Sequence, residues 1–186
     1  MNSRRIEGFV YLAGFIACIP MANWMIGNVG TTCLPKGPCL VPVAPGLMAP
    51  SGVLMVGLAL VLRDLVQRRL GRLCSLGAIG VGAILSAVVA PPSLVLASAA
   101  AFFFSELADF LVYTPLQRRR FVTAVVASSF VGLIVDSIIF LWLAFSSLEF
   151  LAGQLIGKAW MVLASLPFIY WLRVRDSRAG VVQNAA

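Results

Sequence analysis

Long uncharged apolar segments alternate with clusters of arginine along the whole chain. Of the 14 Lys and Arg residues, 12 fall in four clusters, within residues 4–5, 63–72, 118–120 and 173–178. Hydrophobic residues make up 61% of the 186 positions and charged residues only 11%, whereas about a quarter of a soluble domain is charged. Because segments of roughly 20 apolar residues can cross a bilayer as helices, the pattern predicts a polytopic membrane protein.

The predicted fold is all-α, a polytopic membrane helical bundle in which residues 1–186 form a single domain of six transmembrane helices. The expected spans cover residues of about 8–26, 48–70, 73–90, 93–114, 121–146 and 150–172. Arginine clusters mark both termini and the loops after even-numbered spans, and arginine collects on the cytoplasmic side of membranes. We therefore expect both termini in the cytoplasm and the protein in the cell inner membrane. These clusters also account for the net charge of +7, so a nucleic-acid partner is not expected.

The segment between the first two spans is rich in glycine and proline. Prolines at positions 35, 38, 42, 45 and 50 exclude a continuous helix, and we expect an ordered loop that folds back over the outer mouth of the bundle. The segment also holds Cys33 and Cys39. We expect two free thiols there, with a disulfide as the alternative that an oxidising compartment would allow.

Four charged residues lie inside otherwise apolar spans: Glu106, Asp109, Asp136 and Lys158. A charge at the bilayer centre costs at least ~2.5–3.5 kcal/mol on insertion scales, so such residues are candidates for function. All four fall near the middle of their spans when depth is measured from the arginine-marked ends. This similarity of depth predicts one shared polar site.

Helical spacing predicts which side chains share the faces of that site. On one face of the fourth span lie Phe102, Glu106, Asp109 and Tyr113, which follow i, i+4, i+7, i+11 spacing. Gln154 and Lys158 share a face of the sixth span, and Ser129, Asp136 and Phe140 share one of the fifth. Carboxylates, an ammonium, an amide and aromatic rings together suit a pocket for a small, flat, polar molecule.

The alternative is that Lys158 only neutralises Asp136 or Glu106 in a buried pair that fixes helix register. Three acids against one base would still leave at least one acid protonated or matched by a ligand. Arg63 and Asp64, at the inner end of the second span, either belong to the same site or reach out to the membrane interface as a surface pair.

The sequence does not favour an enzyme. It contains no histidine and no glycine-rich phosphate loop. The pair Glu106 and Asp109, one helical turn apart, is only a weak signal for Mg²⁺. We therefore expect no catalytic residues, no metal and no cofactor.

Three segments carry a resemblance to a known family. LVLRDLVQRRLG (60–71), SELADFLVYTPLQ (105–117) and VDSIIFLWLAF (135–145) resemble the queuosine precursor transporter family, which was first described as vitamin uptake transporters. The likeness extends to the loop TTCLPKGPC (31–39) and to the region of residues 153–158. Members of that family are bacterial inner-membrane proteins of about six helices, arranged similarly to the substrate-binding components of energy-coupling-factor vitamin transporters.

The resemblance implies import of 7-deazaguanine bases, such as 7-cyano- and 7-aminomethyl-7-deazaguanine, for tRNA modification. One carboxylate, Glu106 first and Asp136 second, would then accept the N1–H and the amino group of the base in a bidentate contact. Phe102, Tyr113 or Trp142 would stack on the ring, and Lys158 would face the carbonyl oxygen. A spare acid, Asp109 or Asp64, would meet the ammonium of an aminomethyl base.

Two other functions stay open at this point. The chain would also suit the substrate-binding subunit of an ATP-driven vitamin or nucleobase importer, docked through the small-residue face of Ala13 and Ala17. The other is a membrane enzyme or a structural membrane protein. The expected partners are a small-molecule substrate and the lipid bilayer, with a homo-oligomer or an energising partner left open.

Overall fold

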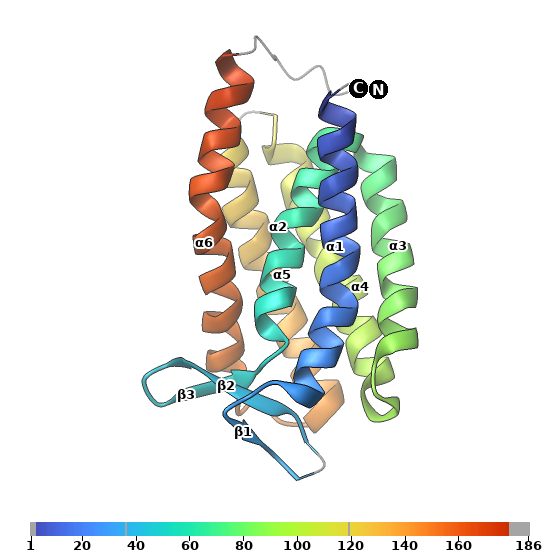
Figure 1. The fold of residues 1–186 in the computed structure, drawn as a ribbon, viewed down its shortest axis with the longest axis vertical. Coiled ribbons are helices and arrows are strands. Elements are labelled where there is room, and N and C mark those ends of the chain that lie inside the picture. The colour runs from blue at the N-terminus through green and yellow to red at the C-terminus, as the bar shows by residue number, and fades with distance from the viewer. Residues whose placement is uncertain (1–2, 36, 119, 179–186) are drawn as a thin grey trace.

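The computed structural model describes residues 3–35, 37–118 and 120–178. It is a bundle of long helices that run side by side, with a small sheet at one end and both chain termini at the other (Figure 1). We call these the sheet end and the arginine end. The helices are α1 (Ser3–Asn28), α2 (Val53–Leu70), α3 (Arg72–Val89), α4 (Val95–Leu116), α5 (Phe121–Phe145) and α6 (Leu151–Arg178), with a 3-10 turn at Pro92–Leu94.

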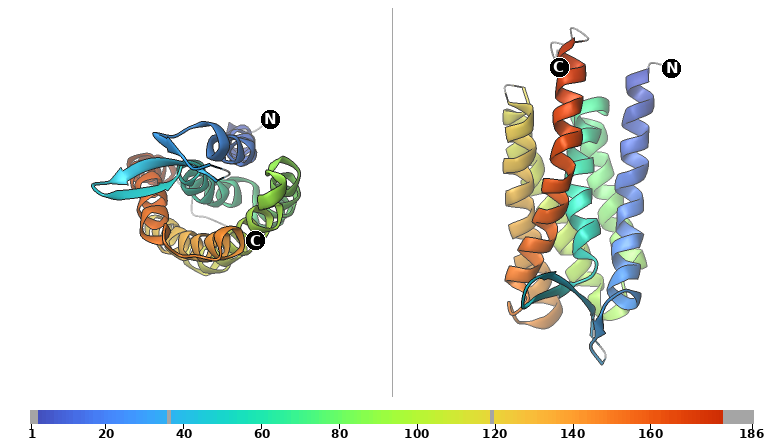
Figure 2. Two further views of the ribbon diagram at one scale, coloured as in Figure 1. Left: turned by 90° about the horizontal axis from the view of Figure 1, so that it is seen from below. Right: turned by 60° about the vertical axis from the view of Figure 1, so that its left-hand side comes forward.

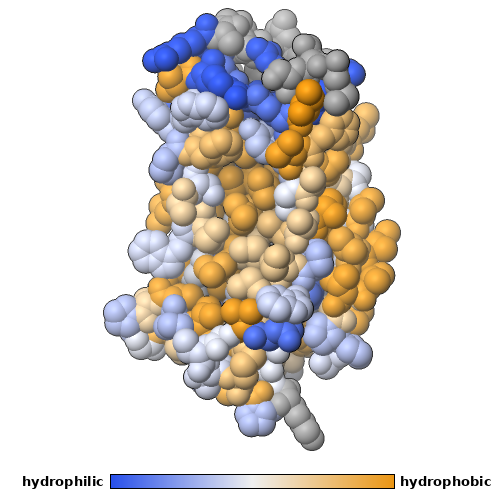
Figure 3. Space-filling model, viewed as in Figure 1, coloured by the Kyte–Doolittle hydropathy of each residue, from blue (hydrophilic) through white to orange (hydrophobic). Residues whose placement is uncertain are grey.

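The surface follows the pattern that a membrane imposes. A broad apolar band covers the middle of the molecule, and hydrophilic residues gather most strongly at the arginine end (Figure 3). Large apolar side chains such as Leu73, Val88 and Leu96 are more than two-thirds exposed, which is favourable only where lipid covers them. Five helices, all except α2, are long and apolar enough to cross a membrane. The predicted all-α polytopic membrane bundle is confirmed.

Helix α2 has a different place from the others. It lies among the other five helices and packs against each of them (Figure 2). Its 18 residues include the charged Arg63, Asp64, Arg68 and Arg69, which lower its hydropathy below that of the other five. Because neighbouring helices cover it, these charges do not need to face lipid. A sixth membrane crossing by α2 stays a prediction.

Three short strands form the sheet end. β1 (Thr32–Cys33), β2 (Cys39–Ala44) and β3 (Leu47–Pro50) pair antiparallel in the order β1-β2-β3. The segment is therefore ordered and non-helical, as expected from its prolines, but it pairs as a sheet. The predicted start of the second span at residue 48 is wrong, because Leu47–Pro50 is a strand and the helix begins at Val53.

The sheet is fastened to the bundle at several points. Ser51 donates a hydrogen bond to the carbonyl oxygen of Met25 at 2.6 Å, and the indole of Trp160 donates to Val43 at 2.9 Å. Cys33 and Cys39 face each other across β1 and β2 and form a disulfide. The expectation of two free thiols is therefore wrong, because strand pairing brings the two cysteines together.

Three other predicted boundaries shift, and the first is the start of α1, at Ser3 instead of about residue 8. Helix α4 includes Pro115 and ends one residue beyond it, at Leu116. Helix α6 runs six residues past the expected end at 172. This extension brings Arg175 and Asp176 into the arginine end.

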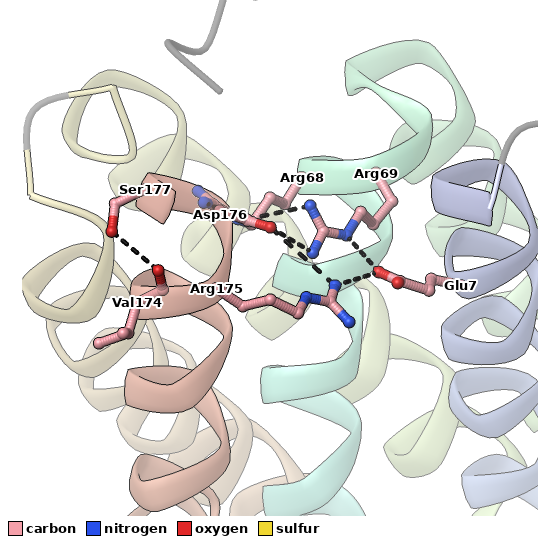
Figure 4. Close-up of polar contacts among 7 residues, drawn as sticks. All are labelled: Glu7, Arg68, Arg69, Val174, Arg175, Asp176 and Ser177. Carbon is pink, nitrogen blue, oxygen red and sulfur yellow. Dashed lines mark hydrogen bonds and ion pairs between the residues drawn. The ribbon is translucent and has the colours of Figure 1, made fainter. Parts of the chain in front are cut away.

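Ion pairs tie three helices together at the arginine end (Figure 4). Asp176 of α6 accepts from Arg68 at 2.6 Å and from Arg69 at 3.0 Å, both on α2. Glu7 of α1 contacts Arg69 at 3.1 Å and Arg175 at 2.6 Å. The network closes this end of the bundle around α2.

Candidate functional site

The bundle encloses a cavity in the half nearer the sheet end. Its volume is about 80 Å³, counted as the space that the centre of a water-sized sphere can occupy. All six helices and the last residue of β3 contribute to its lining. The polar and aromatic lining residues are Asn23, Ser86, Ser98, Phe102, Ser105, Glu106, Asp136, Phe140, Gln154 and Lys158. Such a cavity, mostly apolar with a few polar groups, is the usual form of a small-molecule site.

Lys158 occupies the α6 wall of this cavity with all three of its donors engaged. Its Nζ donates to Asp136 Oδ2 at 2.6 Å, to Ser137 Oγ at 2.7 Å and to Gln154 Oε1 at 2.5 Å. Only 1% of Lys158 is exposed. An ammonium has three N–H groups and no acceptor, so this lysine has no donor left for a ligand. The expectation that Lys158 faces the carbonyl oxygen of a base is therefore wrong for this conformation.

A close helix crossing fixes the depth of Lys158. A Cβ atom added to Gly57 of α2 would lie 2.6 Å from the backbone oxygen of Lys158, a separation shorter than real contacts allow. Glycine thus lets α2 and α6 approach at this level. The lysine is positioned by the backbone as well as by its three acceptors.

The ammonium orients the two side chains beside it. Because Lys158 can only donate, it fixes the amide of Gln154 with Oε1 toward the lysine, which leaves Nε2 as the polar group available to the cavity. Among the described residues, this Nε2 has no hydrogen-bond partner. Asp136 gives Oδ2 to the lysine, so Oδ1 is its carboxylate oxygen that Lys158 does not bind. Both residues line the cavity.

Glu106 of α4 adds a second carboxylate, at the boundary of the cavity. It is 2% exposed, and its Oε2 lies 3.4 Å from Arg63 Nε without forming a hydrogen bond. Glu106 is thus shared between the cavity and a set of charges deeper in the bundle. We call that set the Arg63 cluster: Arg63, Asp64, Glu106 and Asp109.

The Arg63 cluster lies between the cavity and the arginine end. Arg63 Nη2 contacts Asp64 Oδ1 at 2.6 Å and also contacts Asp109 Oδ1. Its Nη1 donates to Gln67 at 2.9 Å, and Ser128 of α5 donates to Asp64 at 2.9 Å. Arg63, Asp64 and Asp109 are fully buried. Of the two alternatives left open for Arg63 and Asp64, a surface pair at the interface is excluded, because both are fully buried and α2 is covered on all sides at this depth.

The structure divides the sequence-predicted site into two groups. Glu106, Asp136, Lys158, Gln154 and Phe102 line the cavity, whereas Asp109, Arg63 and Asp64 do not. Tyr113, with no exposed surface, packs its ring 5.5 Å from the Arg63 guanidinium carbon. Trp142, 60% exposed, points away from the cavity, so neither Tyr113 nor Trp142 is placed to stack on a ligand there.

Sequence reasoning missed the contributions of the first and third helices. Asn23 of α1 and Ser86 of α3 line the cavity. A polar residue inside an apolar span is the signal that would have found them. Cys18, which also lines the cavity, carries no such signal because free cysteine behaves as a small apolar residue.

No metal site is evident within residues 3–35, 37–118 and 120–178. No three His, Cys, Asp or Glu side chains there are arranged to hold a metal ion. The acids of the Arg63 cluster are instead gathered around a guanidinium.

Comparison with known proteins points to transport. Residues 83–172 match the model of a family described as "Putative vitamin uptake transporter". The match supports membership of a transporter family. It covers just under half of the chain, including α4, α5 and most of α6, and so contains every acid and base that lines the cavity. Among curated proteins and solved structures, none matches the chain.

The family match and the five apolar helices agree. The chain is a multi-pass membrane protein, and the match indicates an uptake transporter for a small molecule rather than an enzyme.

Proposed function

We propose that this protein is an inner-membrane importer of queuosine precursors, the bases 7-cyano- and 7-aminomethyl-7-deazaguanine. In this proposal six helices cross the membrane, both termini are cytoplasmic and the sheet end faces the periplasm. The arginine clusters support this orientation, since the helix ends that carry them, the start of α1 and the ends of α2, α4 and α6, all lie at the same end of the bundle (Figure 1). The imported base would supply tRNA modification.

One observation carries the choice of substrate. The cavity is lined by Glu106 and by Gln154 and Asp136, which each give one oxygen to Lys158 and keep a second polar atom, Nε2 and Oδ1, that the lysine does not bind. The pairing edge of a 7-deazaguanine has the complementary order: a carbonyl oxygen, then N1–H, then an amino group. In a dry site, hydrogen bonds to a carboxylate are about twice as strong as neutral ones.

This assignment changes the role of Lys158. Gln154 Nε2 donates to the carbonyl oxygen, and the two carboxylates accept from N1–H and the amino group. Lys158 holds both Gln154 and Asp136 in position without touching the base. Phe102 and Phe140, on α4 and α5, supply flat apolar faces for the ring, and stacking on an aromatic is worth ~1–3 kcal/mol per base.

The aminomethyl substrate also needs a partner for its ammonium. Asp109 and Asp64 lie outside the cavity, so they do not supply it. Of the acids that line the cavity, Glu106 is the one not already bound to Lys158. It suits either the cationic substituent or the pairing edge, and because the 7-substituent and the amino group lie on opposite sides of the ring, a Glu106 that meets the ammonium leaves the pairing edge to Asp136 and Gln154.

Uptake measurements test the proposal. Cells that lack their own importer would express this chain alone and be given labelled 7-deazaguanine bases, with guanine as competitor. We expect Glu106→Gln to reduce uptake at limiting substrate at least tenfold at normal protein levels. Glutamine turns an N–H toward the donors of the base and leaves it unpaired, at ~1–3 kcal/mol.

A second variant separates recognition from folding. Gln154→Glu still accepts from Lys158 but removes the donor for the carbonyl oxygen, so we expect the same loss of uptake at an unchanged protein level. Gln117→Glu makes the identical change outside the cavity and should transport normally. Normal uptake by both Glu106→Gln and Gln154→Glu would refute the site. Uptake that appears only with an added ATP-driven module would make the chain a binding subunit.

A further inference from the structure

Apart from Glu106, the residues of the Arg63 cluster have no role in holding the base, yet the cluster concentrates more charge than the cavity does. Its members come from α2 and α4, and Ser128 of α5 closes its third side. None of these residues except Glu106 lines the cavity. Charges buried in a membrane protein at this cost are generally retained for function.

The acids of the bundle interior outnumber the bases. Within the described residues, the buried interior between the sheet end and the arginine end holds four carboxyl groups and two cations. The carboxyl groups are Asp64, Glu106, Asp109 and Asp136, and the cations are Arg63 and Lys158. Lys158 is matched by Asp136, so Arg63 alone faces three acids. An unmatched buried carboxylate is strongly unfavourable, and the surplus requires a bound positive charge.

The geometry places that charge between Asp64 and Asp109. Both carboxyl groups contact the same nitrogen of Arg63, Nη2, so their oxygens lie close together. Two carboxylates so close cannot both stay ionised and commonly share one proton. A proton on one of them converts a repulsive pair into a hydrogen-bonded one.

Independent evidence comes from polar atoms that lack partners. Asp109 Oδ2 is buried and forms no hydrogen bond with any described residue, and the same holds for the hydroxyl of Tyr113. Both side chains have no exposed surface, and the Tyr113 ring packs against the Arg63 guanidinium. Buried polar atoms without partners are rare. One of these two belongs to the pair Asp64 and Asp109 and the other lies beside it, and this pair carries more negative charge than Arg63 neutralises.

We propose that the Arg63 cluster is a proton-binding site, and that the proton held by Asp64 and Asp109 moves across the membrane with the substrate. The coupling rests on the proposed import of a base, whereas the site itself does not. Glu106 links the two events, because it touches Arg63 on one side and the cavity on the other. A ligand that binds Glu106 weakens the contact between Glu106 and Arg63. This changes how strongly Arg63 competes with the proton for the carboxyl groups of Asp64 and Asp109.

The groups that face this proton come from every element packed around it. They are Arg63, Asp64, Gln67 and Arg68 of α2, Glu106, Asp109 and Tyr113 of α4, and Ser128 of α5, with Asp136 and Lys158 beyond Glu106. None of these is a histidine, since the chain has none. Protonation must therefore be carried by a carboxyl group.

Infrared spectroscopy of the purified protein tests the site without any substrate. A protonated carboxyl group gives a C=O stretch separate from that of a carboxylate. We expect this band at neutral pH in the unmodified protein, a loss of intensity in Asp109→Asn, and no change in Glu149→Gln, where Glu149 is exposed at the sheet end. Asp64→Asn serves as the second variant if Asp109→Asn does not fold. Absence of the band at neutral pH would overturn the proposal.

Reconstituted vesicles test the coupling. With a pH-sensitive dye inside, addition of the base should acidify the lumen, and an inward proton gradient should accelerate uptake severalfold. Asp109→Asn should bind the base within about twofold of the unmodified protein but lose both effects. Uptake driven by a sodium gradient instead, or proton movement that survives Asp109→Asn, would overturn the coupling. A protein that binds no base would contradict the proposed function and leave the infrared result to decide the proton site.

Discussion

Replacement of Lys158 by methionine tests how the cavity wall is held. Methionine keeps the length and most of the volume but removes the charge that Asp136, Ser137 and Gln154 all bind. Breaking a buried pair by removing one partner costs ~3–5 kcal/mol, because the remaining charge is left uncompensated. At about 2–4 °C per kcal/mol for a chain of this length, the midpoint of thermal unfolding should fall by roughly 6–20 °C.

The assay uses a thiol of the protein itself. Cys18 is 5% exposed in the folded state, so a thiol-reactive dye reports its exposure as the detergent-solubilised protein unfolds. The double variant Lys158→Met with Asp136→Asn removes both charges and should recover most of the loss. Arg173→Met, which removes an exposed cation, is the control and should lower the midpoint little.

A double-mutant cycle tests whether Lys158 and Asp136 interact as described. A coupling energy of at least ~2 kcal/mol between positions 158 and 136 is expected for residues in direct contact. If Lys158→Met costs under ~1 kcal/mol, or the two changes simply add, Lys158 does not hold Asp136 as described.

Two further predictions concern orientation and the sheet end. A reporter fused at Ser147 should be periplasmic and one fused at Arg72 cytoplasmic, and the reverse result at either position would contradict the proposed topology. In denaturant without reductant, Cys33 and Cys39 should both resist a thiol label, and Cys33→Ser should make Cys39 reactive. Labelling of both thiols in the unreduced protein would exclude the disulfide.

The positions and approximate lengths of the helices could be predicted from the sequence, because a helix that crosses lipid needs a long apolar segment and arginine marks the ends of these segments. Most boundaries fall within a few residues of those expected. The larger departures are at the starts of α1 and α2 and at the end of α6. At the start of α2, Leu47–Pro50 is as apolar as the helix that follows but pairs with β2. Hydropathy alone does not separate an apolar strand from the first turn of an apolar helix.

The central position of α2 could not be predicted with the same tools. Its charges resemble those of a helix end at the membrane surface, which is why the sequence leaves open whether Arg63 and Asp64 belong to the site or reach the interface. The informative signal was the apolar character of Val61, Leu65 and Val66 around them, each at most 1% exposed. A helix apolar on every side is generally covered by other helices.

The shared face on α4 was only partly informative about the site. Phe102 and Glu106 line the cavity, whereas Asp109 and Tyr113, further along the same face, adjoin Arg63. Helical spacing predicts which residues of α4 point in the same direction. It does not predict which part of that face lines the cavity and which part contacts Arg63. The depth at which α2 places Arg63 divides this face, and that depth depends on tertiary packing.

The most direct test of the account is a binding titration of the purified protein with two ligands of the same shape. One is 7-cyano-7-deazaguanine, and the other is the analogue with an adenine-type edge, in which the donor and acceptor order is changed. The account predicts binding of the first and at least tenfold weaker binding of the second, with that preference lost in Gln154→Glu. Equal affinity for both ligands in the unmodified protein would show that Gln154, Asp136 and Glu106 do not read the pairing edge, and would contradict the central claim.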